Sequence, residues 1–193
     1  MPWREAGHEV TCVDVQHDRS DHSHALHCWE RLEDDVLNFT WHNTIKFDVI
    51  FAFPPCTHLS KAGARHWEKK GLAPFIEALQ IVKACLDICQ TATKFWMMEN
   101  PSGRLSSCWQ KPNYRFDPCD YAGYLSEPGC WEENYAKQTC LWTSDSFVMP
   151  LHKPVEQRPG NWTNSFGESK DRANKRSATP RGFAQAVFEA NCK

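Results

Sequence analysis

The apolar positions along the chain predict strands alternating with a helix. Residues 47–53 (FDVIFAF) and 94–100 (KFWMMEN) are continuous apolar runs, which are typical of strands buried on both faces in parallel sheets. Between them, residues 73–89 carry apolar side chains at helical spacing, so we expect an amphipathic helix there. A strand, a helix and a second strand in this order predict a right-handed βαβ unit.

Weaker patterns extend this unit toward the N-terminus. Residues 10–15 predict a strand that follows a helix end and a glycine turn. Residues 17–39 are polar and rich in histidine, and they predict a loop followed by a short helix.

Three segments follow the βαβ unit. Residues 101–136 are dense in Pro, Gly, aromatic side chains and Cys, and they predict an irregular insertion before a strand at 138–144. Residues 143–178 predict a basic loop. A closing helix is expected after it, with Thr179 as N-cap and Pro180 at the first helical position.

The two apolar strands each end in residues that carry chemistry. Cys56 follows the first strand behind Pro54 and Pro55, and Glu99 and Asn100 close the second. Because functional groups collect at the carboxyl ends of strands in open parallel sheets, we expect both motifs to border one cleft. A thiolate beside a proton-donating carboxyl suits addition to an electron-poor ring such as a pyrimidine. The alternative for a free cysteine is a small, buried apolar residue.

Composition narrows the class of protein. A chain of 193 residues fits one domain, 1–193, and the formal net charge of −2 gives no strong signal for a polyanionic partner. We expect no membrane association, because no apolar stretch is long enough to span a bilayer. No signal-peptide core is visible, so we expect a cytoplasmic protein whose ten cysteines are reduced.

Two groups of residues are candidate metal ligands. The first is a polar stretch that completes no four-ligand zinc frame, so a loop is favoured. The second is a set of four cysteines, which could hold one zinc ion although their even, wide spacing is not that of a zinc knuckle. We therefore predict no metal site. The two groups are His17, His22, His24, His27 and Cys28, and Cys108, Cys119, Cys130 and Cys140.

The motifs resemble those of DNA cytosine-C5 methyltransferases. FAFPPCTHLSKAG is similar to the family's Pro-Cys motif, in which a serine and a glycine follow the cysteine as Ser60 and Gly63 do here. MMENPSG resembles the family's Glu-Asn motif. The chain is closer still to small phage and prophage cytosine methyltransferase-like proteins. With them it shares PPCTHL, ENPxGxL, KxTCLW and a final Arg-Ser…Gly-Phe-Ala segment.

The resemblance implies a fold, an activity and a set of site residues. The fold would be the α/β, Rossmann-like methyltransferase fold with a mostly parallel sheet, in a bacterial or phage-infected cell. The activity would be methyl transfer from S-adenosylmethionine to cytosine C5 in DNA through a covalent adduct. Cys56 would be the nucleophile, Glu99 the proton donor to N3, and Asn100 would orient the loop. The resemblance also implies cofactor contacts by Asp14, Asp35, Phe53 and Pro55, and substrate contacts by Pro54, Ser60, Lys137 and Thr139.

The chain departs from the family pattern in two places. It lacks the opening strand and the Phe-x-Gly-x-Gly loop that cradles the cofactor, so we expect a sheet without its first strand. Only the loop at 143–178 stands in place of a target-recognition domain, which leaves room for a recognition partner. Two alternatives stay open: a catalytically degenerate binding or regulatory protein, such as an anti-restriction factor, and an enzyme that modifies a pyrimidine nucleotide.

Overall fold

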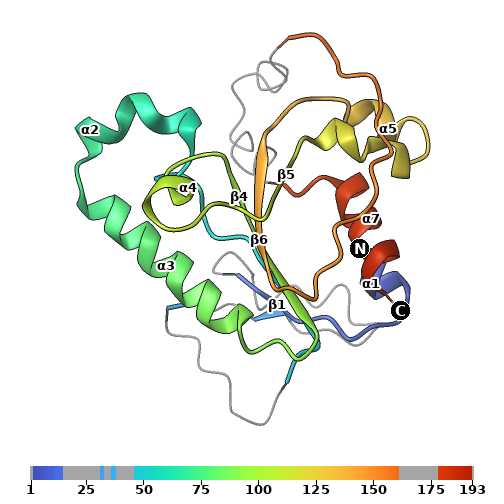
Figure 1. Cartoon of the computed structure of the whole chain (residues 1–193), viewed down its shortest axis with the longest axis horizontal. Coiled ribbons are helices and arrows are strands. Elements are labelled where there is room, and N and C mark those ends of the chain that lie inside the picture. The colour runs from blue at the N-terminus through green and yellow to red at the C-terminus, as the bar shows by residue number, and fades with distance from the viewer. Residues whose placement is uncertain (1, 15–30, 33–35, 38–45, 161–177, 193) are drawn as a thin grey trace. The chain divides into compact units, whose positions relative to one another are not determined.

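The computed structural model describes residues 2–14, 31–32, 36–37, 46–160 and 178–192. The chain forms two compact units, one of residues 1–113 with 141–147, and one of residues 114–140 with 148–193 (Figure 1). Within the described residues, no helix is both long enough and apolar enough to cross a membrane.

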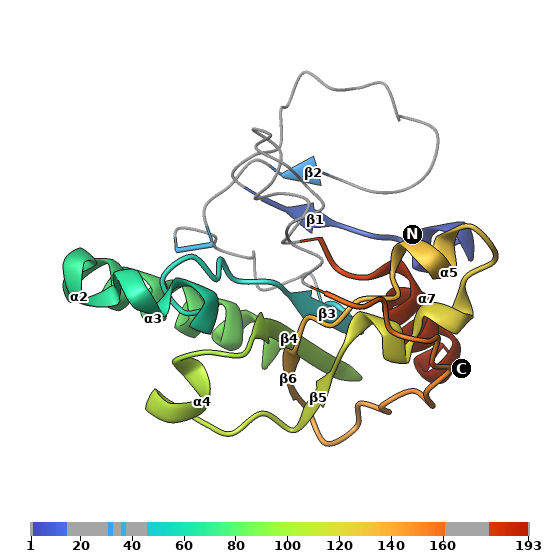
Figure 2. The ribbon, with the colours of Figure 1, turned by 90° about the horizontal axis from the view of Figure 1, so that it is seen from above.

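The first unit contains most of the predicted elements. Its β3–α3–β4 segment confirms the predicted strand, helix and strand. Strands β3 and β4 pair in parallel, from Val49 opposite Phe95 to Ala52 opposite Met98, and α3 packs against both (Figures 1 and 2). The elements of this unit are α1 (Pro2–Glu5), β1 (Cys12–Val13), β2 (Arg31–Leu32), β3 (Val49–Ala52), the 3-10 helix η1 (Lys61–His66), α2 (Trp67–Lys70), α3 (Ala73–Cys89), β4 (Phe95–Pro101) and α4 (Leu105–Cys108).

The larger sheet corrects the prediction of a mostly parallel arrangement. Its order is β3-β4-β6-β5, where β5 is Tyr114–Phe116 and β6 is Thr139–Thr143, and only β3–β4 is parallel. The chain after β6 runs antiparallel to β4: the Ser144 amide donates to the Trp96 carbonyl, and the Ser146 hydroxyl to that of Lys94. The error arose because apolar runs indicate burial and not strand direction.

Strand β3 also differs from its predicted burial on both faces. All four of its residues are half-buried. The reason is its place at the end of the strand order, since among the described strands of this sheet it neighbours β4 alone. Strands β1 and β2 form a separate parallel pair, with Cys12 opposite Arg31.

Aromatic and methionine side chains fill the core of the first unit. The Trp3 ring of α1 lies 5.9 Å from that of Phe51 and 6.3 Å from that of Phe95, which joins α1 to β3 and β4. Met97 and Met98 of β4 are almost completely buried. Buried aromatic and methionine side chains of this size contribute most of the apolar area that leaves water on folding.

The second unit packs short helices around three rings. Phe116 stacks on Phe183 with centroids 4.0 Å apart, and Tyr121 lies edge-on to both. The predicted irregular insertion therefore contributes ordered short elements to this unit. They are β5, the 3-10 helices η2 (Pro118–Asp120) and η3 (Ala122–Tyr124), and α5 (Gly129–Glu132); α7 (Arg181–Asn191) is the closing helix.

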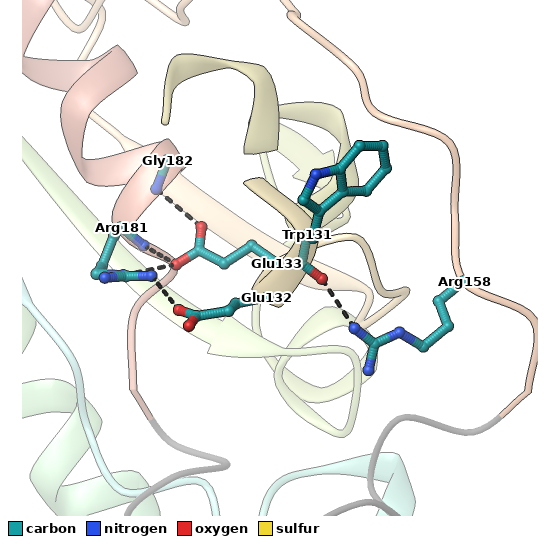
Figure 3. A network of polar contacts seen from close by, with 6 residues as sticks. All are labelled: Trp131, Glu132, Glu133, Arg158, Arg181 and Gly182. Carbon is teal, nitrogen blue, oxygen red and sulfur yellow. Dashed lines mark hydrogen bonds and ion pairs between the residues drawn. The ribbon is translucent and has the colours of Figure 1, made fainter. Parts of the chain in front are cut away.

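The start of α7 corrects the predicted cap. Pro180 is the N-cap residue, in place of Thr179, and the cap has no hydrogen bond from its own side chain. The buried Glu133 carboxylate instead accepts hydrogen bonds from the backbone amides of Arg181, at 2.6 Å, and Gly182, at 2.8 Å (Figure 3). A carboxylate at this helix end satisfies two amides that have no partner within the helix. Local sequence could not reveal a cap supplied by a distant residue.

Replacing Glu133 by alanine is expected to lower the free energy of unfolding by about 2–3 kcal/mol, because two amides at the helix start lose a charged acceptor. Urea unfolding measures the change. Glu132→Ala is the matched control. Its exposed carboxylate pairs with the Arg181 side chain, and an exposed ion pair of this kind contributes less than about 1 kcal/mol. Equal decreases in the free energy of unfolding in the two variants would contradict the role of Glu133 as the helix cap.

Candidate functional site

The Pro-Pro-Cys corner after β3 is a turn anchored on both sides of Cys56. Pro54 and Leu59 are buried, and Leu59 has no exposed surface. The Cys56 carbonyl accepts hydrogen bonds from the Leu59 amide, at 3.0 Å, and the Ser60 amide, at 2.9 Å. The turn is therefore fixed by its buried residues, and the Cys56 side chain is left half-buried.

Three hydrogen bonds join this corner to the end of β4 and the residues after it. The Asn100 side-chain amide donates to the Pro54 carbonyl at 2.8 Å. The Lys61 amide donates to the Ser102 carbonyl, and the Arg104 amide donates to the Leu59 carbonyl, both at 2.8 Å. The Asn100 bond spans 46 residues, the same offset as the β3–β4 register (95 − 49 = 46), so the corner continues the strand pairing. The two motifs thus lie side by side at the carboxyl edge of the parallel pair.

Glu99 and Asn100 have different environments at this edge. Asn100 is 1% exposed and part of the core, whereas Glu99 is half-buried. Two buried polar atoms of this region, Asn100 Oδ1 and His58 Nδ1, have no hydrogen-bond partner among the described residues. Buried polar atoms without partners are unfavourable for folding, and a catalytic or ligand-binding role is one reason why a native structure keeps them.

Gly103 allows the close approach of the two segments. A Cβ built on it would lie 2.0 Å from the Leu59 carbonyl oxygen, well inside van der Waals contact. Residue 103 is also in an antiparallel bridge with Ser60. Only glycine fits this position without moving the backbone that follows Cys56.

Gly103→Ala is expected to destabilise the first unit by about 2–3 kcal/mol, because the new methyl group overlaps main-chain atoms that cannot rotate away. Thermal unfolding checks this expectation. Gly63→Ala is the control, since its Cβ would sit 3.6 Å from the Thr57 oxygen, an ordinary contact. A Gly103→Ala protein as stable as Gly63→Ala would show that the corner and the end of β4 are not held together as described.

Two other thiols of the first unit lie on α3, where Cys85 is half-buried and Cys89 is buried. Burial raises the pKa of Cys85 to about 11 and that of Cys89 to about 12. Both thiols therefore stay protonated at neutral pH, and Cys89 is one of the buried residues of α3.

The other residues implied by the resemblance fall in several places. Asp14 follows β1 and is exposed, Phe53 is 48% exposed, and Pro55 is exposed beside Cys56. Ser60 belongs to the corner through its backbone bridge. Asp35 lies outside the described residues. The cofactor and substrate contacts of all these residues stay predictions.

Lys137 and Thr139 belong to the second unit. Thr139 is 1% exposed, and its hydroxyl donates to the Lys137 carbonyl at 2.9 Å. Their contact with a substrate also stays a prediction.

The candidate zinc ligands do not gather in the part of the chain that the structure describes. No three His, Cys, Asp or Glu side chains there lie close enough to hold a metal ion, and that part includes Cys108, Cys119, Cys130 and Cys140. The histidine-rich group at residues 17–28 lies outside the described residues.

Sequence patterns did not single out two residues of this region, Gly103 and Arg104. The glycine of ENPSG was visible as part of a motif, but its contact with Leu59 depends on tertiary structure. Arg104 places its guanidinium carbon 3.9 Å from the centre of the Trp67 ring and 4.3 Å from that of Phe75. No local pattern predicts this stacking, because the two rings belong to different helices.

Comparison with known proteins gave no match to any family model. The chain is similar to a protein of Frog virus 3 (isolate Goorha) named "Probable DNA (cytosine-5)-methyltransferase", with 29% identity over 129 residues. The aligned region is 60% of this chain and 56% of that protein, so the chain spans little more than half of the relative's length.

Proposed function

We propose that the chain transfers a methyl group from S-adenosylmethionine to C5 of cytosine in DNA, with Cys56 as the nucleophile. The observation that carries the proposal is the set of hydrogen bonds between the Cys56 corner and the end of β4, by which Cys56 and Glu99 lie at one edge of the sheet. Both residues are half-buried. Similarity to a protein with that name supports a methyltransferase-like function.

The chemistry would begin with addition of the Cys56 thiolate to C6 of the pyrimidine. Glu99, in its protonated form, would donate its proton to N3. The electron pair of the C5–C6 double bond then gives C5 the character of a carbanion. Asn100 holds the Pro54 carbonyl, which would keep the corner in place during the addition. C5 would then take the electrophilic methyl group, and the donor would be left as a neutral thioether. Loss of the C5 proton to a base, with departure of the Cys56 thiolate and return of the N3 proton to Glu99, would restore the ring.

The described residues fit a methyl donor with an adenosyl group in two respects. Phe53, directly before the corner, is 48% exposed and offers an aromatic face, and Pro55 is exposed on the other side of Pro54. Asp14 is an exposed carboxylate after β1, suited to ribose hydroxyls. When bound, S-adenosylmethionine supplies an electrophilic methyl group.

If the substrate is duplex DNA, the cytosine must leave the base stack to reach Cys56. Sequence readout requires side chains in the major groove, and the basic segment 143–178 is the part of the chain available for it. A recognition partner would supply further specificity. We also propose that the protein works in the cytoplasm.

Covalent trapping tests the proposal. Cytosine carrying fluorine at C5 cannot lose that atom as a cation, so the bond between Cys56 and C6 persists after methyl transfer. We expect a denaturation-resistant complex with 5-fluorocytosine DNA that depends on S-adenosylmethionine. Absence of the complex, together with no calorimetric binding of S-adenosylmethionine at millimolar concentration, would instead favour a catalytically degenerate binding protein. A complex with the free fluorinated nucleotide alone would favour the nucleotide-modifying alternative.

A further inference from the structure

The segment that follows the Cys56 turn is strongly basic. Residues 61–70 form η1 and α2 and contain four Lys or Arg side chains against one acid, Glu68. The four cations, all exposed, are Lys61, Arg65, Lys69 and Lys70. The chain as a whole carries a formal net charge of −2, so this concentration of positive charge is local. A basic surface next to a reacting group attracts an anionic ligand to that place.

Arg104 reaches this basic segment from the end of β4. Its guanidinium is stacked between the Trp67 ring of α2 and the Phe75 ring of α3. Two aromatic faces attract the charge of the guanidinium, and neither ring neutralises it. Among the described residues, the Arg104 side chain has no ion pair with a carboxylate. A guanidinium held between two rings and without a carboxylate partner suits the oxygen atoms of a phosphate.

Backbone hydrogen bonds fix Arg104 and Lys61 beside the Cys56 turn. The Arg104 amide donates to Leu59, which itself donates to the Cys56 carbonyl. The Lys61 amide donates to Ser102, two residues before Arg104. The antiparallel bridge pairs Ser60 with Gly103, so the backbones of Lys61 and Arg104 flank that pair diagonally, and Lys61 follows Cys56 by five residues.

We propose that Arg104 and Lys61 form a phosphate-binding subsite that holds a phosphodiester of the polynucleotide next to the cytosine at Cys56. This inference rests on the proposed function, and it selects DNA over a free nucleotide as the substrate. The subsite contacts the backbone and not a base edge, so it contributes to affinity and register without reading sequence.

Salt dependence of DNA binding tests the subsite. Fluorescence anisotropy would measure the affinity for a short cytosine-containing duplex over a series of NaCl concentrations. Each lost phosphate contact lowers the slope of log K against log salt by about 0.9 in magnitude. We expect this loss in Arg104→Gln and again in Lys61→Gln, whereas Arg104→Lys keeps the slope because it keeps the charge. A purely structural role of the stacked arginine would change stability but leave the slope at the wild-type value.

Lys111→Gln is the matched control, because Lys111 is an exposed cation of the same unit near β6. Wild-type slopes in both Arg104→Gln and Lys61→Gln, or an equal fall in Lys111→Gln, would overturn the subsite.

Binding of deoxycytidine monophosphate distinguishes the two phosphate sources. If Arg104→Gln abolished nucleotide binding and left the DNA slope unchanged, the ligand would be a phosphate monoester, and the inference would be wrong. A reduced slope in a protein that forms no adduct with 5-fluorocytosine DNA would uphold the subsite and refute only the proposed reaction.

Discussion

Replacing Cys56 by alanine is expected to abolish both methyl transfer to cytosine and the covalent complex with 5-fluorocytosine DNA. The reaction as proposed has no route without the bond between sulfur and C6, because cytosine C5 is a poor nucleophile until that bond forms. Incorporation of labelled methyl groups into DNA measures the first loss, and gel electrophoresis under denaturing conditions measures the second. Folding should be little affected, because the Cys56 side chain is half-buried and the turn is anchored by Pro54 and Leu59.

Cys108→Ala serves as the control for this variant. Cys108 is an exposed thiol of the same unit, so its removal also takes away an accessible sulfur. We expect full activity and full adduct formation in that protein. Persistent adduct in Cys56→Ala, or its loss in Cys108→Ala, would assign the nucleophile to another residue.

Glu99→Gln is expected to lower the rate of methyl transfer by about 10²–10⁴-fold, the usual contribution of a general acid. Glutamine keeps the shape and hydrogen-bonding groups of a protonated carboxyl but has no proton to transfer to N3. Single-turnover rates of methyl incorporation measure the effect, which corresponds to about 3–5 kcal/mol in the activation barrier. DNA affinity, determined by anisotropy, should remain within a few-fold of the wild-type value.

Glu77→Gln provides the comparison for the acid. Glu77 is an exposed carboxylate on α3 in the same unit, and its neutralisation changes the net charge by the same amount. We expect a wild-type rate for this variant. If Glu99→Gln retained that rate as well, N3 protonation would have to come from another group or from solvent.

Long elements with a strong period were predictable from the sequence. The helix expected at 73–89 matches α3, and the apolar runs contain β3 and β4 in the expected parallel pairing. The pairing follows from connectivity, because a helix between two strands returns the chain to the same edge. The position of Cys56 and Asn100 on adjacent segments follows from the same argument.

Features that depend on distant contacts were not predictable. The Glu133 carboxylate caps a helix 48 residues further along the chain, whereas local rules indicated Thr179. The direction of β6 relative to β4 depends on the path of the chain between them. The pattern of apolar residues does not indicate this path. The stacking of Arg104 likewise requires two helices to meet the end of a strand.

The contact at Gly103 has an evolutionary consequence. The atoms nearest to its missing Cβ belong to the main chain of Leu59 and Ser60, so no exchange of a neighbouring side chain can make room for a larger residue. In a saturation mutagenesis library selected for folded protein, we expect glycine to be strongly enriched at position 103, and we expect no suppressor of another residue there among the side chains around it.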